Sequence, residues 1–215
     1  MDELPCPVHL CLGQEAVPDA LHECLNPEDW LFSTHRNHGH YLAKGGSEQK
    51  LMDEIMGLPT GVNGGFMGSQ CFSDPDINFY STAMVGGLIG VATGTALSLK
   101  LAGSKAVVVC CIGDGATEQG VFWESLNFAA LHVLPIAYIC EDNGYSVHAP
   151  KSERQTGNIE NKVAAFGLMA ISPDYGVHAA IDQARNGNPS FTQVQCTREC
   201  NHVGNMPDFR SGEAA

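Results

Sequence analysis

Two short polar segments follow apolar stretches that have the composition of buried strands. A Gly-Asp-Gly sequence centred on Asp114 comes directly after the apolar run 106–112, and an Asn-Gly-Tyr sequence beginning at Asn143 follows the apolar run 136–140. The carboxyl ends of neighbouring parallel strands lie about 5 Å apart, at the edge where open α/β sheets bind ligands. We therefore expect Asp114 and Asn143 to converge on one site.

The side-chain types in these segments point to a metal ion that bridges to phosphate. The glycines beside Asp114 let backbone approach a ligand closely, and the helix predicted over 117–131 offers N-terminal N–H groups to phosphate. A carboxylate in that place would repel phosphate unless a cation lay between them. A carboxylate, an amide oxygen and a backbone carbonyl form an oxygen set suited to Mg²⁺.

Other interpretations of these segments fit less well. Asp-Gly and Asn-Gly are also ordinary turn dipeptides, so one Gly-Asp-Gly sequence alone would not separate a turn from a site. The dinucleotide fingerprint fails because Gly113, Gly115 and Gly120 do not match GxGxxG. The P-loop fails because no Lys-Ser or Lys-Thr follows Gly120. The presence of two polar strand ends favours the metal site over two unrelated turns.

Hydrophobic periodicity predicts the elements that position this site. Helices are predicted over 14–25, 47–56, 86–101, 117–131 and 175–185, and strands over 106–112, 136–140 and 191–196. Continuous apolar runs of strand length are typical of a sheet covered on both faces. The alternation predicts an α/β fold in which a parallel sheet carries helices on both faces. The polar segment 60–80 is predicted to form a long loop.

Composition excludes several classes of protein. The chain has 215 residues, 44% of them hydrophobic, which suits a single domain over 1–215. A formal net charge of −13 argues against a nucleic-acid partner, and no apolar run is long enough to cross a membrane. Segment 1–7 has no signal-peptide pattern, and the nine cysteines do not indicate a secreted disulfide framework, so we expect reduced thiols and a cytoplasmic location.

A zinc site near the C-terminus is a weaker alternative. Cys196, Cys200 and His202 lie close together in the sequence and offer ligand types that zinc accepts. No second ligand pair at zinc-type spacing accompanies them. The sequence therefore does not favour zinc at these three residues.

Longer stretches around the two polar segments resemble the thiamine-diphosphate motif. More narrowly, they are similar to the alpha subunit of the first component of 2-oxo-acid dehydrogenase complexes, a group that includes pyruvate, branched-chain and acetoin dehydrogenases. The matching segments are 113–120, 127–131, 134–135 and 141–145, with further similarity over 13–16, 34–40, 85–87 and 198–204. The resemblance implies a thiamine-diphosphate-binding fold and decarboxylation of a 2-oxo acid, with the acyl group passed to a lipoyl group on an acyltransferase.

The resemblance also implies which residues hold the cofactor and its metal. Asp114, Asn143 and the carbonyl of Tyr145 would hold Mg²⁺. The backbone amides of Gly115 and Ala116 would meet the diphosphate of thiamine diphosphate. These roles agree with the metal-bridged phosphate site that the two polar segments indicate by themselves.

Other matching positions would surround the rest of the cofactor. His35, at a position that is commonly tyrosine in the family, would also contact it, and the backbone of Ala83 and Val85 would face the aminopyrimidine. His202 would lie on a loop near the diphosphate and the reacting carbon. His202 and His38 are the candidate catalytic residues.

Each of these charged or titratable residues also has an ordinary structural interpretation. The forked guanidinium of Arg36 would pair with a diphosphate oxygen, and the weaker alternative is that Arg36 is a surface charge. His38 and His40 could be solvated loop residues, and His202 could be a loop histidine without a role. The sequence leaves these alternatives open.

The chain departs from the family pattern in ways that bear on activity. Family members normally begin further upstream and continue past the loop that carries His202, so this chain is expected to be shortened at both ends. Several residues are expected to be missing between Ile171 and Tyr175. Val203 replaces a serine that some members phosphorylate, so control by phosphorylation is not expected there. A shortened, non-catalytic subunit and half of a split transketolase remain as alternatives, although 127–131 and the His202 loop disfavour the second.

A partner chain is expected from what the sequence lacks. The family needs a glutamate against the aminopyrimidine ring, in a pyrimidine-binding domain that no remaining stretch of this chain can build. The resemblance implies a beta-type subunit that carries this domain and an assembly of two copies of each chain. The glycine-lined helix predicted from Gly86 is a candidate packing face, because small residues let backbones approach.

Overall fold

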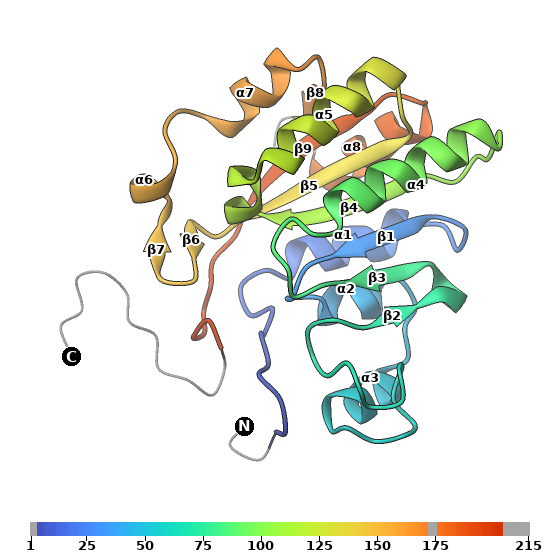
Figure 1. Cartoon of the computed structure of the whole chain (residues 1–215), viewed down its shortest axis with the longest axis vertical. Helices are drawn as coiled ribbons and strands as arrows, with labels where there is room; N and C mark the ends of the chain where they lie inside the picture. The colour runs from blue at the N-terminus through green and yellow to red at the C-terminus, as the bar shows by residue number, and fades with distance from the viewer. Residues whose placement is uncertain (1–3, 172–175, 204–215) are drawn as a thin grey trace.

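A computed structural model describes residues 4–171 and 176–203, and its centre is a seven-stranded sheet in the order β2-β3-β1-β4-β5-β9-β8 (Figure 1). All neighbouring strands run parallel except β2 and β3. The strands are β1 Trp30–Ser33, β2 Ser73–Asp74, β3 Phe79–Ser81, β4 Val108–Gly113, β5 Ile136–Asp142, β8 Met169–Ile171 and β9 Ser190–Gln195. A separate short hairpin pairs β6 Tyr145–Ser146 with β7 Ala149–Pro150.

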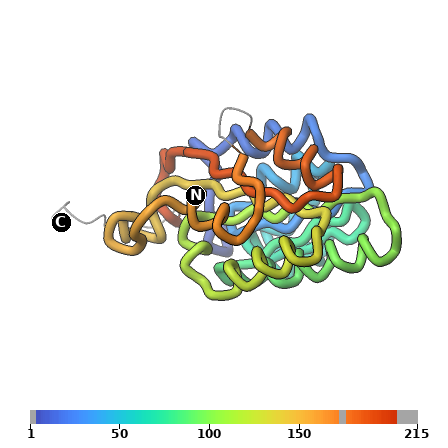
Figure 2. Tube along the Cα trace, turned by 90° about the horizontal axis from the view of Figure 1, so that it is seen from above, coloured from blue at the N-terminus to red at the C-terminus, as the bar shows by residue number. Residues whose placement is uncertain are grey.

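The helices lie on both faces of this sheet, as Figure 2 shows from above. They are α1 Ala16–Cys24, α2 His38–Ala43, α3 Glu48–Ile55, α4 Ile89–Leu101, α5 Gly120–His132, α6 Lys151–Arg154, α7 Ile159–Ala165 and α8 Gly176–Arg185, with 3₁₀ turns η1 Pro75–Ile77 and η2 Asp114–Glu118. The predicted α/β fold is therefore confirmed. Within the described ranges, no helix is long and apolar enough to cross a membrane.

Strand β4 shows why helices must cover both faces. Val109 and Cys111 belong to the apolar cluster that includes α1 and α8, whereas Val108, Cys110 and Ile112 belong to the cluster that includes α4, α5 and α7. Successive side chains of a strand point to opposite faces, so a continuous apolar run requires an apolar cover on each side. The parallel arrangement places the carboxyl ends of β1, β3, β4, β5 and β9 at one edge.

Six short strands and three short helices fall where the sequence predicted none, namely β1, β2, β3, β6, β7 and β8, and α2, α6 and α7. Strand β1 lies in the middle of the sheet, between β3 and β4, although it is only Trp30–Ser33. Strand β3 lies inside the segment 60–80, which was predicted to be a loop. Helix α2 over His38–Ala43 was also missed. These elements are too short to show a periodicity, and pairing with neighbours rather than local pattern stabilises them.

Several predicted boundaries also shift. Helix α4 begins at Ile89 rather than at 86, because Gly86 has a φ of +78° and turns the chain sharply before the helix. The 3₁₀ turn η2 begins at Asp114 and lies between β4 and α5. The first N–H groups after Asp114 therefore belong to that turn and not to an α-helix. The described residues do not include Tyr175, where a helix was predicted to begin, or the stretch before it, where residues were expected to be missing. They also do not include Gly204, the last residue of the matching segment 198–204.

The loop after α3 is organised around one buried carboxylate. Glu54 is fully buried, and its two oxygens accept hydrogen bonds from the backbone N–H groups of Asn63, Gly65, Met67 and Gly68. Those four donors would otherwise lack partners, because the loop forms no sheet or helix there. A single side chain thus fixes the loop path. Helix α3 itself buries Leu51 and Ile55 and leaves Met52 and Met56 exposed.

Candidate functional site

A cavity of about 330 Å³ opens at the carboxyl edge of the sheet. It is bounded by the segments that follow β1, β3, β4, β5 and β9. The predicted site residues that line it are His35, Arg36, Ala83, Val85, Asp114, Gly115, Ala116, Asn143, Tyr145 and His202. His38 is not among the lining residues. Its Nε2 instead lies 2.9 Å from the hydroxyl of Ser69, in the loop after α3. The structure therefore brings together all the predicted site residues except His38.

Asp114 lies at the wall of the cavity, directly after β4. Its side chain is 2% exposed, and its Oδ2 accepts a hydrogen bond from Arg154 at 2.5 Å. Burial raises the pKa of Asp114, and the nearby Asp142 adds to that effect, whereas Arg154 opposes it. Arg154 also contacts Glu118, so one guanidinium partly neutralises two acids in this structure. The sequence did not indicate Arg154, since it lies 40 positions from Asp114.

The next strand end places its own oxygens at the same cavity. Asn143 follows β5, and its Oδ1 accepts a hydrogen bond from the backbone N–H of Tyr145 at 3.0 Å. Gly115 packs so closely on this segment that a Cβ there would lie 2.9 Å from the hydroxyl of Ser146. A side chain at this position would require the Ser146 side chain to move, so glycine suits the close approach.

These residues fit a magnesium ion next to a phosphate. Asp114 offers a carboxylate, Asn143 an amide oxygen and Tyr145 a carbonyl oxygen, and all three residues line one cavity. Hard dications such as Mg²⁺ prefer this all-oxygen donor set. The buried carboxylate of Asp114 gives the site a negative charge that a dication would balance.

Arg36 connects two distant segments at the cavity. Its Nη1 donates to the carbonyl of Leu10 at 2.6 Å, and its Nη2 donates to the carbonyl of His202 at 3.3 Å. The same Nη2 lies 3.3 Å from Nδ1 of His202. Since only 7% of Arg36 is exposed, the interpretation as a surface charge is wrong. A buried guanidinium at a cavity wall is suited to bind an oxyanion.

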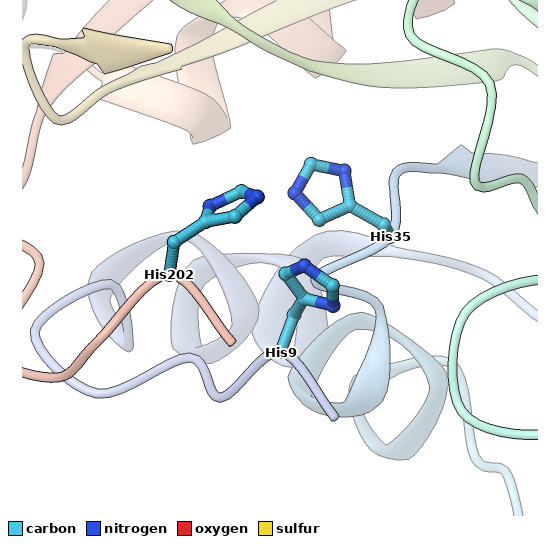
Figure 3. Close-up of side chains that lie close together, drawn as sticks. All are labelled: His9, His35 and His202. Carbon is cyan, nitrogen blue, oxygen red and sulfur yellow. The ribbon is translucent and has the colours of Figure 1, made fainter. Parts of the chain in front are cut away.

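The rings of His9, His35 and His202 lie close together (Figure 3). The ring of His9 lies with its centroid 4.7 Å from those of His35 and His202, and the last two are 5.7 Å apart. Burial lowers the pKa of His9 to about 3 and that of His35 to about 4, and the charges of neighbouring histidines and Arg36 add to both shifts. Both rings are therefore neutral near pH 7.

Sequence reasoning missed His9 and Gln14, which also line the cavity. Both side chains are buried, and neither His9 Nδ1 nor Gln14 Nε2 has a hydrogen-bond partner among the described residues. Buried polar atoms without a partner are unusual and point to a missing ligand. The matching segment 13–16 was a signal for this region, but a short irregular segment shows no periodicity that assigns a role.

A buried polar network supports the cavity from behind. His40 is 1% exposed, with Nδ1 at 2.7 Å from the hydroxyl of Ser33 and Nε2 at 3.4 Å from Oε2 of Glu141. Burial alone would lower the pKa of His40, but Cys111 and Glu141 outweigh it and raise the pKa. His40 is therefore not a solvated loop residue. Ser33, Cys111 and Glu141 also line the cavity, so this network orients its floor.

The chain is similar to known proteins over most of its length. Residues 5–173 match the family model described as the dehydrogenase E1 component. The alpha subunit of acetoin:2,6-dichlorophenolindophenol oxidoreductase from Bacillus subtilis is 37% identical over 210 residues, which are 93% of this chain and 63% of that protein. The corresponding subunit from Cupriavidus necator is 35% identical, covering 97% of this chain and 66% of that protein.

Pyruvate dehydrogenases give matches of similar strength. The E1 component subunit alpha from Porphyra purpurea is 35% identical over 219 residues, which are 94% of this chain and 64% of that protein. The chain therefore spans slightly less than two thirds of the length of these curated relatives. The match of one family model over most of the chain, together with a cavity that gathers the residues of the family motif, shows that this chain belongs to the dehydrogenase E1 component family.

Proposed function

We propose that this chain is the alpha-type subunit of a thiamine-diphosphate-dependent dehydrogenase that acts on a 2-oxo acid or on acetoin and passes the acyl group to a lipoyl carrier. The observation that carries the proposal is one cavity that combines the oxygen donors of Asp114, Asn143 and Tyr145 with the buried guanidinium of Arg36. Relatives named as alpha subunits of acetoin:2,6-dichlorophenolindophenol oxidoreductase and of the pyruvate dehydrogenase E1 component support it.

In this proposal, the chain holds the diphosphate end of the cofactor. Asp114, Asn143 and the carbonyl of Tyr145 would hold Mg²⁺, whose charge would offset that of the diphosphate. The backbone amides of Gly115 and Ala116 would donate hydrogen bonds to the diphosphate. Arg36 adds a charge-assisted hydrogen bond. When bound, thiamine diphosphate would stabilise the negative charge that develops at the substrate's carbonyl carbon.

The remaining residues of the chain position and enclose the reacting groups. His202 lies at the cavity beside Arg36, where its ring can contact the diphosphate or the substrate. Ala83 and Val85 offer backbone groups to the aminopyrimidine from the turn between β3 and α4. His38 also stays proposed as a catalytic residue, although in the isolated chain it does not line the cavity and its Nε2 lies 2.9 Å from the Ser69 hydroxyl.

The proposal includes a beta-type partner that completes the site at an interface. Helix α4 and the turn before it expose a stripe of small and apolar residues, comprising Met84, Val85, Gly87, Gly90, Val91, Gly94 and Leu101. Such a stripe suits close packing against another chain. We further propose that the assembly holds two copies of each chain and that the acyl group passes to a lipoyl acyltransferase. We also propose a cytoplasmic location, which the nine free cysteines favour.

The test is to produce the full chain with and without a beta-type subunit and to assay a panel of 2-oxo acids and acetoin with a dye acceptor. We expect turnover that requires the partner, Mg²⁺ and thiamine diphosphate together. Calorimetry with thiamine diphosphate and Mg²⁺ separates binding from turnover. Cofactor binding without turnover on any substrate would indicate a non-catalytic subunit, and no binding would refute the proposal.

A further inference from the structure

We propose that, in the chain without bound thiamine diphosphate, His9, His35 and His202 form a second metal site, which takes a transition dication such as Zn²⁺ and uses different ligands from those proposed for Mg²⁺. The three residues come from segments that are far apart in the chain: His9 precedes α1, His35 follows β1, and His202 follows β9. Figure 3 shows the three rings directed toward one common point.

The geometry of the three rings supports coordination. Each residue offers one ring nitrogen, and these three atoms all lie within 4.8 Å of one another. Zinc binds histidine nitrogen at about 2.0–2.1 Å in a tetrahedron, which places ligand nitrogens roughly 3.4 Å apart. The rings therefore need to move inward by about 1 Å. All three stand on segments without helix or strand structure, so this movement breaks no hydrogen-bond ladder.

The chemistry of the ligands selects the class of metal. Imidazole nitrogen suits Zn²⁺ and similar transition metals, whereas Mg²⁺ prefers oxygen. His9 is buried, and its Nδ1 has no hydrogen-bond partner among the described residues. Because the three residues line the cavity, the fourth position is left for water or another small ligand.

One nearby charge opposes the metal. The guanidinium of Arg36 lies 3.3 Å from Nδ1 of His202 and would repel a dication. We therefore expect weaker binding than at a structural zinc site with four protein ligands. The positive charge also favours an anionic fourth ligand, since hydroxide or phosphate would offset it.

The zinc alternative that the sequence offered used different residues. Among the described residues, the group within coordinating reach joins His202 to His9 and His35 and includes neither Cys196 nor Cys200. The structure thus replaces a mixed thiol and histidine site with an all-histidine one.

The test is a Co²⁺ titration of the full chain, prepared without thiamine diphosphate and kept in excess Mg²⁺ to occupy the oxygen-rich site. Cobalt reports its ligands through its absorption spectrum. We expect one bound Co²⁺ per chain with a four-coordinate spectrum, no thiolate charge-transfer band, and displacement by Zn²⁺. A thiolate band, or no binding, would overturn the proposal.

Two substitutions locate the site. His35→Tyr removes the ring nitrogens but keeps an aromatic ring, and His202→Gln removes the third ligand. Each should weaken Co²⁺ binding by about hundredfold, because every ligand supplies a large share of the binding free energy. His178→Gln is the matched control, since His178 is exposed and faces Glu23 away from the cavity. Circular dichroism checks folding, and either folded variant decides the outcome: unchanged affinity would refute the site.

Discussion

Asp114 illustrates how a single residue links the fold to the proposed chemistry. A carboxylate that is 2% exposed requires a positive partner, and Arg154 supplies it in this structure at 2.5 Å. A dication at the cavity would be a second partner for the same carboxylate. Glu118 shares Arg154 but does not line the cavity, so the two acids can be separated by mutation.

We expect Asp114→Asn to weaken Mg²⁺-dependent binding of thiamine diphosphate by about hundredfold or more, because the substitution removes the charge that holds the metal. Calorimetry with the partner subunit present measures this affinity. Glu118→Gln is the matched control, because it also removes an acid from Arg154 and should leave the affinity unchanged. Equal losses in both variants would mean that the ion pairs, and not a metal, determine binding.

The buried histidines predict a specific loss of stability in acid. The pKa of His35 falls from 6.5 to about 4 on folding, and that of His9 falls to about 3. Between these values and pH 6.5 the unfolded chain binds more protons than the folded chain, so the free energy of unfolding falls as the pH falls below 6.5. The greatest slope is about 1.4 kcal/mol per pH unit for each histidine.

Urea unfolding of the metal-free chain between pH 7 and pH 5 tests this expectation. His35→Tyr should lose less stability on acidification than the unchanged chain, because tyrosine does not bind a proton in this range. His178→Gln provides the comparison at an exposed site. If His35→Tyr keeps the full acid dependence, His35 does not stay neutral in the folded chain.

At the scale of the element, the loop after α3 is ordered by one side chain and not by a regular hydrogen-bond pattern. Glu54 accepts four backbone hydrogen bonds from residues 63–68. The carboxylate replaces the neighbouring strand or helix that would normally satisfy these donors. The loop therefore has a defined path although its sequence has the composition of a flexible segment.

We expect Glu54→Gln to lower the free energy of unfolding by about 3 kcal/mol, since glutamine removes the charge and turns an NH₂ group toward backbone donors. The midpoint of urea unfolding measures the effect. Glu48→Gln, on the exposed side of the same helix, should change stability by less than about 0.5 kcal/mol. A small effect of Glu54→Gln would show that the loop has another source of order.

At the scale of the whole molecule, the sheet gathers the site at one edge and leaves an apolar stripe on α4 facing outward. Leu101 is 79% exposed and Val91 52%, and a side chain added at Gly94 would meet no atom within 4 Å. An exposed stripe of this kind is costly in an isolated chain and is expected where another chain packs. The proposed beta-type partner would cover it.

Gly94→Leu should therefore separate folding from assembly. We expect the variant chain to be more stable by up to about 1 kcal/mol, because leucine favours a helix more than glycine does. Assembly with the beta-type subunit should fail, because the side chain fills the space that a partner would occupy. Sedimentation of the mixed subunits measures assembly, and Ala164→Leu on the exposed face of α7 is the control. Normal assembly of Gly94→Leu would place the partner elsewhere.

The sequence by itself determined the parts of this protein that depend on local pattern. The apolar runs that became β4, β5 and β9 and the periodic segments that became α1, α3, α5 and α8 could be predicted, because burial on one or two faces leaves a regular trace in the residue order. The convergence of Asp114 and Asn143 followed from the same logic, since parallel strands end at one edge.

Only the tertiary structure decided which residues from irregular segments join that edge. His9, Arg154 and His40 gave no periodic signal, and each acquires its surroundings from residues at least seven positions away in the sequence. The short central strand β1 depends on pairing with β3 and β4 for the same reason. Contacts between distant segments depend on the path of the whole chain. The pairing of Asp114 with Arg154, the contact of His38 with Ser69 and the meeting of three histidines therefore appear only once the sheet has formed.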